Sequence, residues 1–354
     1  MYYAENWDKS KERFKAFWEH EMVVRASVFI RYPKANKPKR DVPQVSLEES
    51  YTNPEWILER NLEMFEDSNY VAEGFAFSKV TWISAGQCGY TDGAKYQYAK
   101  DTVWAFPSMT ELDPNQIVFN ENNPVFQHHL TMHKYFVDNA NGRYMVGNMD
   151  NTGNLDALAH LRGTTELLMD MYDNPEGVKA CHQKLFDIQK FTTNAYMDTY
   201  EKSNPGTLVP WMGLWCPERC VQAQCDISVM MSPEMFEEFG LPELEAHKDW
   251  PGKMVYHFDG MEQIAHLDMM LECEAIDVIQ WTPVAGQPKT AEFIPILKKI
   301  QNAGKSLVLM PGADEVDILT KELSHKGLHF KFWSISNDEE AEYVIKTAGK
   351  NAHE

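Results

Sequence analysis

Apolar residues recur along the chain in two alternating patterns. Short apolar runs of strand length are followed by longer segments in which apolar side chains return every three or four residues. The clearest unit spans residues 253–283, where an apolar run ends in His257 and Asp259, a helical pattern follows, and a second run ends at Trp281. The pattern therefore predicts a strand, a helix and a second strand in this segment.

The same alternation predicts a β/α architecture for most of the chain. Eight strands are expected, at residues 26–31, 143–148, 208–214, 226–230, 254–258, 277–281, 306–310 and 328–333. Strands that alternate with helices imply a parallel sheet, and eight such units imply a (β/α)8 TIM barrel. An open doubly wound sheet is the alternative, and the missing glycine-rich first turn argues against it.

We predict a single domain over residues 1–354. Residues 141–348 supply most of the barrel units, and residues 1–140 form an N-terminal helical and irregular extension with an insertion. A helix expected over residues 123–139 carries His129 and His133 four residues apart, a spacing that permits metal binding. No acidic pattern accompanies this pair, so solvent exposure or core packing is the favoured interpretation.

Composition and charge narrow the class of partner. The formal net charge of −20 argues against a nucleic-acid backbone. No apolar run approaches the roughly 20 residues that span a bilayer, and the N-terminal segment lacks the apolar core of a signal peptide. Six cysteines suit a reducing compartment without a disulfide framework. We expect a cytoplasmic protein with a small-molecule substrate and no membrane partner; a homodimer stays open.

Polar residues at strand ends are the candidates for chemistry, because active sites of α/β proteins lie there. His257 and Asp259 point to the same side of an extended chain, and together they can share a metal ion or a proton. The alternative is a loop-bound histidine and a turn aspartate before Gly260. Asp226 is a further catalytic candidate. The candidate substrate-binding residues at other strand ends are Asn148, Asp150, Trp215, Gln280, Trp281 and Trp333. The tryptophans would equally serve to fill the barrel top.

The segment around these residues resembles the uroporphyrinogen decarboxylase superfamily. The matching positions, in order, are Asp226, Ser232-Pro233, Phe236, Phe239, Leu241-Pro242, His257 and Gly260. The helical region at residues 155–180 is similar too, and the resemblance extends over about residues 140–348.

The resemblance implies a (β/α)8 barrel and two kinds of chemistry. Some members decarboxylate tetrapyrroles without a metal, but their arginine-rich N-terminal signature is not found here. Others are zinc-dependent methyltransferases that work with corrinoid proteins or coenzyme M. These bind zinc through a His-x-Cys pair and a later cysteine. Here Asp259 stands at the cysteine position and the last strand has no cysteine.

Zinc, if bound, would therefore be held by His257 and Asp259, with Cys225 as a replacement thiolate; Cys216 and Glu218 are alternatives. Oxygen ligands leave zinc more electrophilic than thiolates do, so this set would favour an oxygen substrate such as a methyl ether.

Three functions remain open at this point. The first is a metal-dependent methyltransferase or demethylase with a corrinoid partner protein. The second is a metal-independent decarboxylase that uses Asp226 or His257 as acid or base, with Arg143, Arg162 and Arg219 as candidate carboxylate clamps. The third is a non-catalytic binding protein on the same scaffold.

Overall fold

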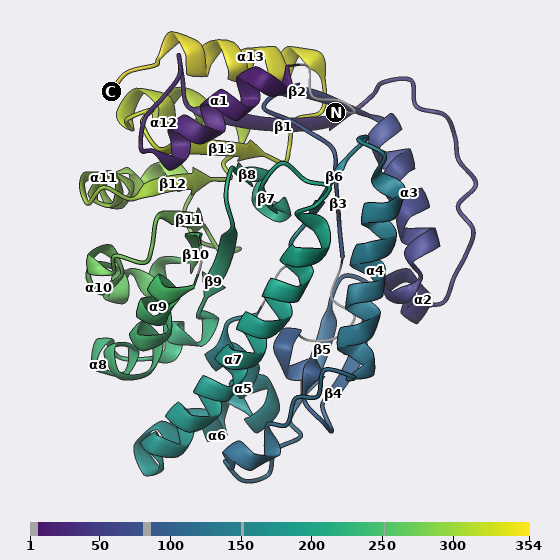
Figure 1. Cartoon of the computed structure of the whole chain (residues 1–354). Coiled ribbons are helices and arrows are strands. Elements are labelled where there is room, and N and C mark those ends of the chain that lie inside the picture. Colours follow the sequence, from purple (N-terminus) through teal and green to yellow (C-terminus); the bar gives the residue numbers. More distant parts are fainter. Residues whose placement is uncertain (1–5, 81–85, 150–151, 251) are drawn as a thin grey trace.

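The structure, a computed structural model, describes residues 6–80, 86–149, 152–250 and 252–354. It is a mixed α/β fold in which helices pack outside a seven-stranded sheet (Figure 1). In order across the sheet, the strands are β2 (Ser68–Ala72), β1 (Ser27–Pro33), β13 (Leu328–Phe332), β12 (Ser306–Leu309), β11 (Val278–Thr282), β10 (Lys253–Asp259) and β9 (Cys220–Gln224). Neighbouring strands are parallel except β1 and β2.

Three two-stranded sheets complete the strand pairing. They are β3 (Phe77–Lys79) with β6 (Met145–Gly147), β4 (Lys95–Tyr98) with β5 (Val103–Phe106), and β7 (Thr207–Val209) with β8 (Leu214–Cys216). The first pair is parallel and the other two are antiparallel. Among the described residues, these pairings do not join the small sheets to the large one. A closed eight-stranded barrel therefore stays a prediction.

Helices connect most of the strands. The α-helices are α1 (Trp7–Trp18), α2 (Leu47–Thr52), α3 (Pro54–Glu66), α4 (Pro124–Ala140), α5 (Asn154–Arg162), α6 (Thr164–Asp173), α7 (Pro175–Tyr200), α8 (Pro233–Met235), α9 (Leu241–Ala246), α10 (Leu267–Glu272), α11 (Ile294–Asn302), α12 (Val316–Glu322) and α13 (Asp338–Lys350). The 3-10 turns used below are η3 (Pro210–Met212) and η4 (Asp226–Met230). Asn337 caps α13, because its side chain accepts a hydrogen bond from the main-chain N–H of Glu340.

The sheet is buried on both faces, as a parallel sheet covered by helices must be. Its outer face packs against the helices through residues such as Tyr256, Ile279 and Phe330. We call the opposite face, which carries Val255 and Val278, the inner face. The inner-face cluster consists of Phe14, Phe17, Trp18, Phe29, Phe75, Met145, Leu208, Val209, Met212, Leu214, Trp215, Cys216, Cys220, Val255, Val278 and Val308. Helix α1 contributes the first three of these, so it covers part of the inner-face cluster.

Five of the predicted strands are confirmed, as β1 and β10 to β13. The strand predicted at 143–148 shrinks to the three residues of β6. The one predicted at 208–214 splits into β7 and β8, which turn back on each other through η3 and Gly213, whose φ of 62° is left-handed. None of the helices in the described part of the chain combines the length and apolar character that a bilayer crossing requires.

The strand predicted at 226–230 is wrong. Those residues form the 3-10 turn η4, and the strand lies just before them as β9. After Cys220, the inner face of β9 carries Gln222 and Gln224 in place of apolar side chains. The segment therefore lacks the apolar alternation by which a strand is recognised in a sequence.

His129 and His133 on α4 belong to the core. The Nδ1–H of His133 donates to the carbonyl of His129 at 2.9 Å, and its ring stacks on Tyr196 at a centroid distance of 4.6 Å. The hydroxyl of Tyr90 lies 2.8 Å from Nδ1 of His129. Both imidazoles are fully buried, which matches the packing alternative and not a metal site.

Two buried histidines, His133 on α4 and His329 on β13, should make the protein less stable in mild acid. Burial lowers the pKa of His133 to about 4 and that of His329 to about 3. An unfolded histidine titrates near 6.5, so the unfolded chain takes up protons at a pH where the native one does not. Each neutral buried histidine makes its full contribution to the free energy of unfolding above about pH 6.5. That contribution is lost as the pH falls toward the lowered pKa, by about 1.4 kcal/mol per pH unit for each histidine. In urea unfolding at pH 7 and pH 5, His133→Gln should show a shallower pH dependence than wild type. Equal slopes would contradict this account.

Candidate active site at the carboxyl ends of β9, β10 and β11

Three neighbouring parallel strands bring the candidate side chains together. In the register of the sheet, Gln224 of β9 pairs with His257 of β10, and His257 pairs with Gln280 of β11. Side chains alternate along a strand, so Val255, His257 and Asp259 share the inner face. Val255 is part of the apolar inner-face cluster, and the polar residues lie above it at the strand ends. The strand order thus places His257 and Asp259 between the polar ends of β9 and β11.

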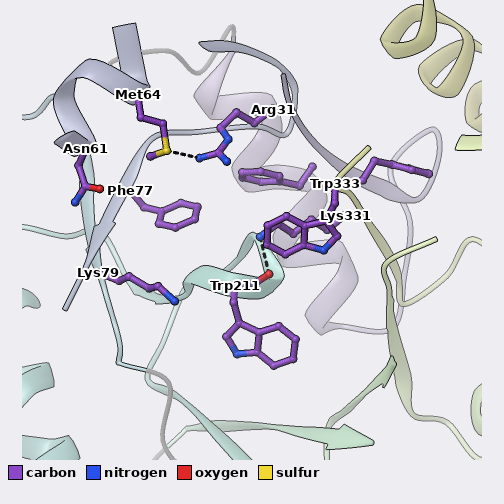
Figure 2. Close-up of a pocket in the computed structure, with 10 residues that line it drawn as sticks. Arg31, Asn61, Met64, Phe77, Lys79, Trp211, Lys331 and Trp333 are labelled. Atoms are coloured by element: carbon purple, nitrogen blue, oxygen red, sulfur yellow. Dashed lines mark hydrogen bonds between the residues drawn. The ribbon is translucent and has the colours of Figure 1, made fainter. Parts of the chain in front are cut away.

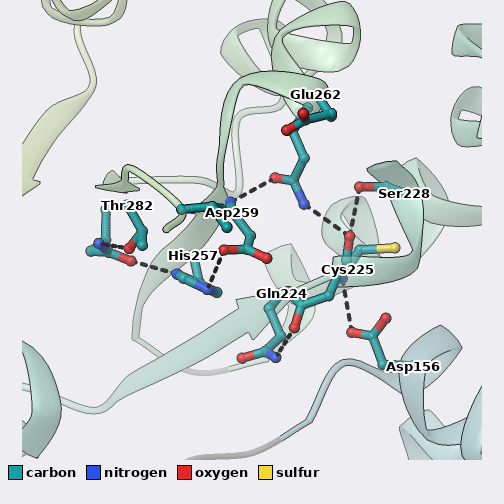
Figure 3. A network of polar contacts seen from close by, with 12 residues as sticks. Asp156, Gln224, Cys225, Ser228, His257, Asp259, Glu262 and Thr282 are labelled. Atoms are coloured by element: carbon teal, nitrogen blue, oxygen red, sulfur yellow. Dashed lines mark hydrogen bonds and ion pairs between the residues drawn. The ribbon is translucent and has the colours of Figure 1, made fainter. Parts of the chain in front are cut away.

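Asp226, His257 and Asp259 converge on one point. One ligand atom from each of the three side chains lies within 4.8 Å of the others, and all three residues are half-buried. Nε2 of His257 lies 3.8 Å from Oδ1 of Asp259 (Figure 3). We call these residues the His257 group. Gly260 turns the chain away directly after Asp259 with a φ of 87°, a conformation that favours glycine.

Gln280 sets the orientation and tautomer of His257. Its Oε1 lies 2.5 Å from Nδ1 of the imidazole, and its own Nε2 donates to Oγ1 of Thr282 at 2.5 Å. The amide oxygen can only accept, so Nδ1 must carry the proton. Nε2 then has a free lone pair on the side of the two carboxylates, and a lone pair so placed can bind a metal or accept a proton.

The main chain at Asp226 is held from outside the sheet by Asp156 on α5. The carboxylate of Asp156 accepts hydrogen bonds from the N–H groups of Asp226, at 2.9 Å, and Ile227, at 2.8 Å. Burial raises the pKa of Asp156 to about 6, although these two N–H groups act in the opposite direction. The side chain of Asp226 also accepts from Nε2 of Gln224 at 3.1 Å. No sequence signal marked Asp156 for this role, because the contact joins positions 70 residues apart.

Cys225 does not join the His257 group. Its thiol is buried and points away from His257 and Asp259 (Figure 3). Its carbonyl, not its sulfur, makes the local contacts, accepting from the side chains of Ser228 and Gln263. Burial, together with the negative charges of Asp156 and Glu243, raises the pKa of Cys225 well above its usual value, which disfavours the thiolate that a metal requires. Asp226 stands where the sequence analysis placed Cys225 as the third ligand.

Two of the tryptophans predicted to bind substrate lie away from the His257 group. Trp281 is fully buried on the outer face, stacked on Phe258 and packed against Phe293. Trp215 is buried beneath α1, with its Nε1–H bonded to the carbonyl of Pro205. Neither tryptophan is placed to meet a substrate at the His257 group.

Two further residues predicted to bind substrate, Asn148 and Trp333, lie in different surroundings. Asn148 is engaged by Tyr200, whose hydroxyl donates to it at 2.6 Å, and by the carbonyl of Cys220. Trp333 is 56% exposed and lines a cavity near the strand ends. Asp150 lies outside the described residues.

The three arginines predicted to bind a substrate carboxylate make other contacts. Arg162 pairs with Asp170, and Arg219 pairs with Asp198 and Glu201. Arg143 donates to the carbonyls of residues 139 and 140. A residue that sequence reasoning missed is Trp211 of η3, whose ring meets the His257 ring edge-on at a centroid distance of 5.2 Å.

Comparison with known proteins gives a structural likeness only. No family model matches the chain, and no curated protein matches it in sequence. Among solved structures, the chain is similar to a methyltransferase from Methanosarcina mazei, with a TM-score of 0.60 and 12% sequence identity over 96% of this chain and 98% of that one. At this identity the likeness shows a shared α/β fold over nearly the whole length of both chains.

Proposed function

We propose that this protein is a metal-dependent methyltransferase or demethylase that acts on a small methylated substrate with a corrinoid partner protein. The observation that carries the proposal is the convergence of Asp226, His257 and Asp259 at the ends of β9 and β10. The fold shared with the Methanosarcina mazei methyltransferase supports it. We further propose that the sheet closes into a (β/α)8 barrel and that the chain belongs to the uroporphyrinogen decarboxylase superfamily.

The residues present fit a zinc ion. One imidazole and two carboxylates are accepted zinc ligands, and three protein ligands with a fourth position open to substrate are typical of catalytic sites. The hydrogen bond from Nδ1–H of His257 to Gln280 is the kind of outer contact that directs a ligating histidine. When bound, zinc would supply a Lewis acid that stabilises the oxygen anion left as a methyl group departs.

The protein's own groups would position the reactants. Gln280 holds the His257 ring with Nε2 aimed at the carboxylates, and Asp156 holds the turn that presents Asp226. The main-chain N–H of Asp259 donates to Gln263 at 3.1 Å, which fixes the end of β10. These contacts hold the three ligands before any substrate arrives, so little reorganisation is required on binding.

A methyl-transfer assay tests the proposal. Protein reconstituted with zinc would be given free cob(I)alamin and a panel of methyl ethers and methylamines, and formation of methylcobalamin would be followed by absorbance. Wild type should show turnover with at least one substrate, and the variant His257→Ala should not. Metal-free wild-type protein that instead releases carbon dioxide from a carboxylated compound would support the lyase alternative.

The contact between Gln280 and His257 gives a more selective test of the metal site. Gln280→Leu removes the acceptor for Nδ1–H, so zinc affinity should fall about 10- to 100-fold, the usual effect of losing such a partner. Gln280→Glu retains an acceptor and should keep most of the affinity. Zinc titration against a competing chelator measures both variants. Equal losses in the two would mean that the hydrogen bond does not orient His257.

A further inference from the structure

A cavity of about 320 Å³ lies beside the His257 group, at the carboxyl ends of β1, β3 and β13 (Figure 2). Three cationic side chains, those of Arg31, Lys79 and Lys331, enter it from different strands. Its remaining walls are largely aromatic, with Met64 and Asn61 beside rings that include Phe77, Trp211 and Trp333. The cavity is thus a mostly apolar space with positive charge concentrated in it.

Lys331 is the most buried of the three cations. Its side chain is almost fully enclosed, and its Nζ lies 3.7 Å from the ring centroid of Trp333. Nζ donates to the carbonyls of Pro210, at 3.3 Å, and Trp211, at 2.5 Å. Burial lowers the pKa of Lys331 well below its usual value, and the charges of Arg31 and Lys79 lower it further. A nearby anion would counter each of these effects.

No acidic partner balances this charge within the described residues. Arg31, Lys79 and Lys331 form no ion pair there, although the chain carries a net charge of −20. Nη1 of Arg31 instead contacts the sulfur of Met64 at 2.8 Å. Lys331 is enclosed and Arg31 and Lys79 are half-buried, so the missing counter-ion is most costly at Lys331. Three cations around one space are best explained by a ligand that brings the negative charge.

The cavity and the His257 group share a wall. Trp211 lines the cavity and also meets the His257 ring edge-on. A ligand whose charged end lies among the three cations can therefore extend along Trp211 toward Nε2 of His257. The aromatic walls suit a flat apolar body, and the forked guanidinium of Arg31 suits a carboxylate.

We infer that this cavity binds the carboxylate of an organic acid with a flat apolar body, and that the acid is the substrate of the neighbouring site. The anion-binding role of Arg31, Lys79 and Lys331 stands on their placement alone. The identity of this acid as the substrate rests on the proposed function. The reacting group would then lie at the opposite end of the molecule from the carboxylate.

Binding of a matched pair of probes tests the inference by calorimetry. 4-Methoxybenzoate and its neutral analogue 4-methoxybenzamide differ in charge but hardly in shape. Wild type should bind the benzoate about tenfold more tightly or better, as expected for charge-assisted hydrogen bonds. Lys331→Met should abolish this preference. Lys79→Met, at a half-buried position, provides a second variant should the buried substitution impair folding. The surface variant Lys346→Met is the control and should bind as wild type does.

His257→Ala separates the two proposals. It should keep the preference for the benzoate, because the cations are intact. If it loses the preference while Lys331→Met and Lys79→Met retain it, the carboxylate binds at the His257 group and the inference is overturned. Equal affinity of wild type for the two probes, or binding of neither, also overturns it. If wild-type protein holds no metal and still prefers the benzoate, the metal-dependent function is refuted and the anion site is retained.

Discussion

Replacing His257 with alanine is expected to abolish stoichiometric metal binding. His257 supplies the only nitrogen ligand of the His257 group, and Asp226 and Asp259 alone would leave two carboxylates facing each other. Loss of a directly bound ligand should cost more than loss of an outer partner, so zinc affinity should fall by more than about 100-fold. Elemental analysis of protein purified without a metal-chelating tag measures this for wild type and variant in parallel.

His128→Ala is the matched control for this experiment. His128 is a half-buried histidine on α4 that contacts the carbonyl of Thr52 and lies outside the His257 group. It should leave the metal content unchanged. Asp259→Asn, which keeps the size of the side chain and removes its charge, should lower metal content as His257→Ala does. Full retention of metal by His257→Ala would refute the metal site.

Glu73→Gln should lower the free energy of unfolding by about 3–5 kcal/mol. Glu73 is completely buried between two arginines. Its carboxylate pairs with Arg13 of α1 at 2.6 Å and with Arg25, just before β1, at 2.7 Å. It also accepts the main-chain N–H of Val28 at 2.7 Å. Removal of the negative charge leaves the two cations close together and uncompensated.

Urea unfolding followed by circular dichroism measures this loss. Glu342→Gln is the control, because Glu342 pairs with Lys346 four residues along α13 at the surface, and such pairs contribute less than about 1 kcal/mol. If the two variants lose equal stability, the buried cluster does not hold α1 to the sheet. A change in the denaturant slope would instead indicate a change in the unfolded state.

Three of the strands that sequence patterning located, β10 to β12, have apolar residues on both faces. They have Val255, Val278 and Val308 on the inner face and large apolar side chains on the outer face. β13 was located by alternation instead, because Leu328, Phe330 and Phe332 on its outer face alternate with His329 and Lys331. Parallel strands buried on both sides produce apolar runs that are visible in the sequence. β9 was misplaced because its inner face is polar where it borders the site. The polar side chains that border the candidate site thus hide this strand from the pattern.

The members of the candidate site that could be predicted are those that a local sequence feature marks. His257 and Asp259 follow from a two-residue spacing at a strand end, and Asp226 from its place in a motif. The partnership of Gln280 with His257 depends on the register of β10 and β11, which is a property of the sheet. Arg31 and Lys331 are 300 residues apart, and each by itself is typical of a surface position.

The order of strands in the sheet has an evolutionary consequence. The metal-ligand candidates come from the ends of β9 and β10, whereas the cations of the neighbouring cavity come from β1, β3 and β13. The hydrogen bonds from His257 to Gln280 and from the main chain at Asp226 to Asp156 involve none of the three cations. A lineage could therefore exchange the acid it recognises while preserving the reaction it performs. Within such a lineage, variation should concentrate on the β1–β13 side, and the β9–β11 side should change little.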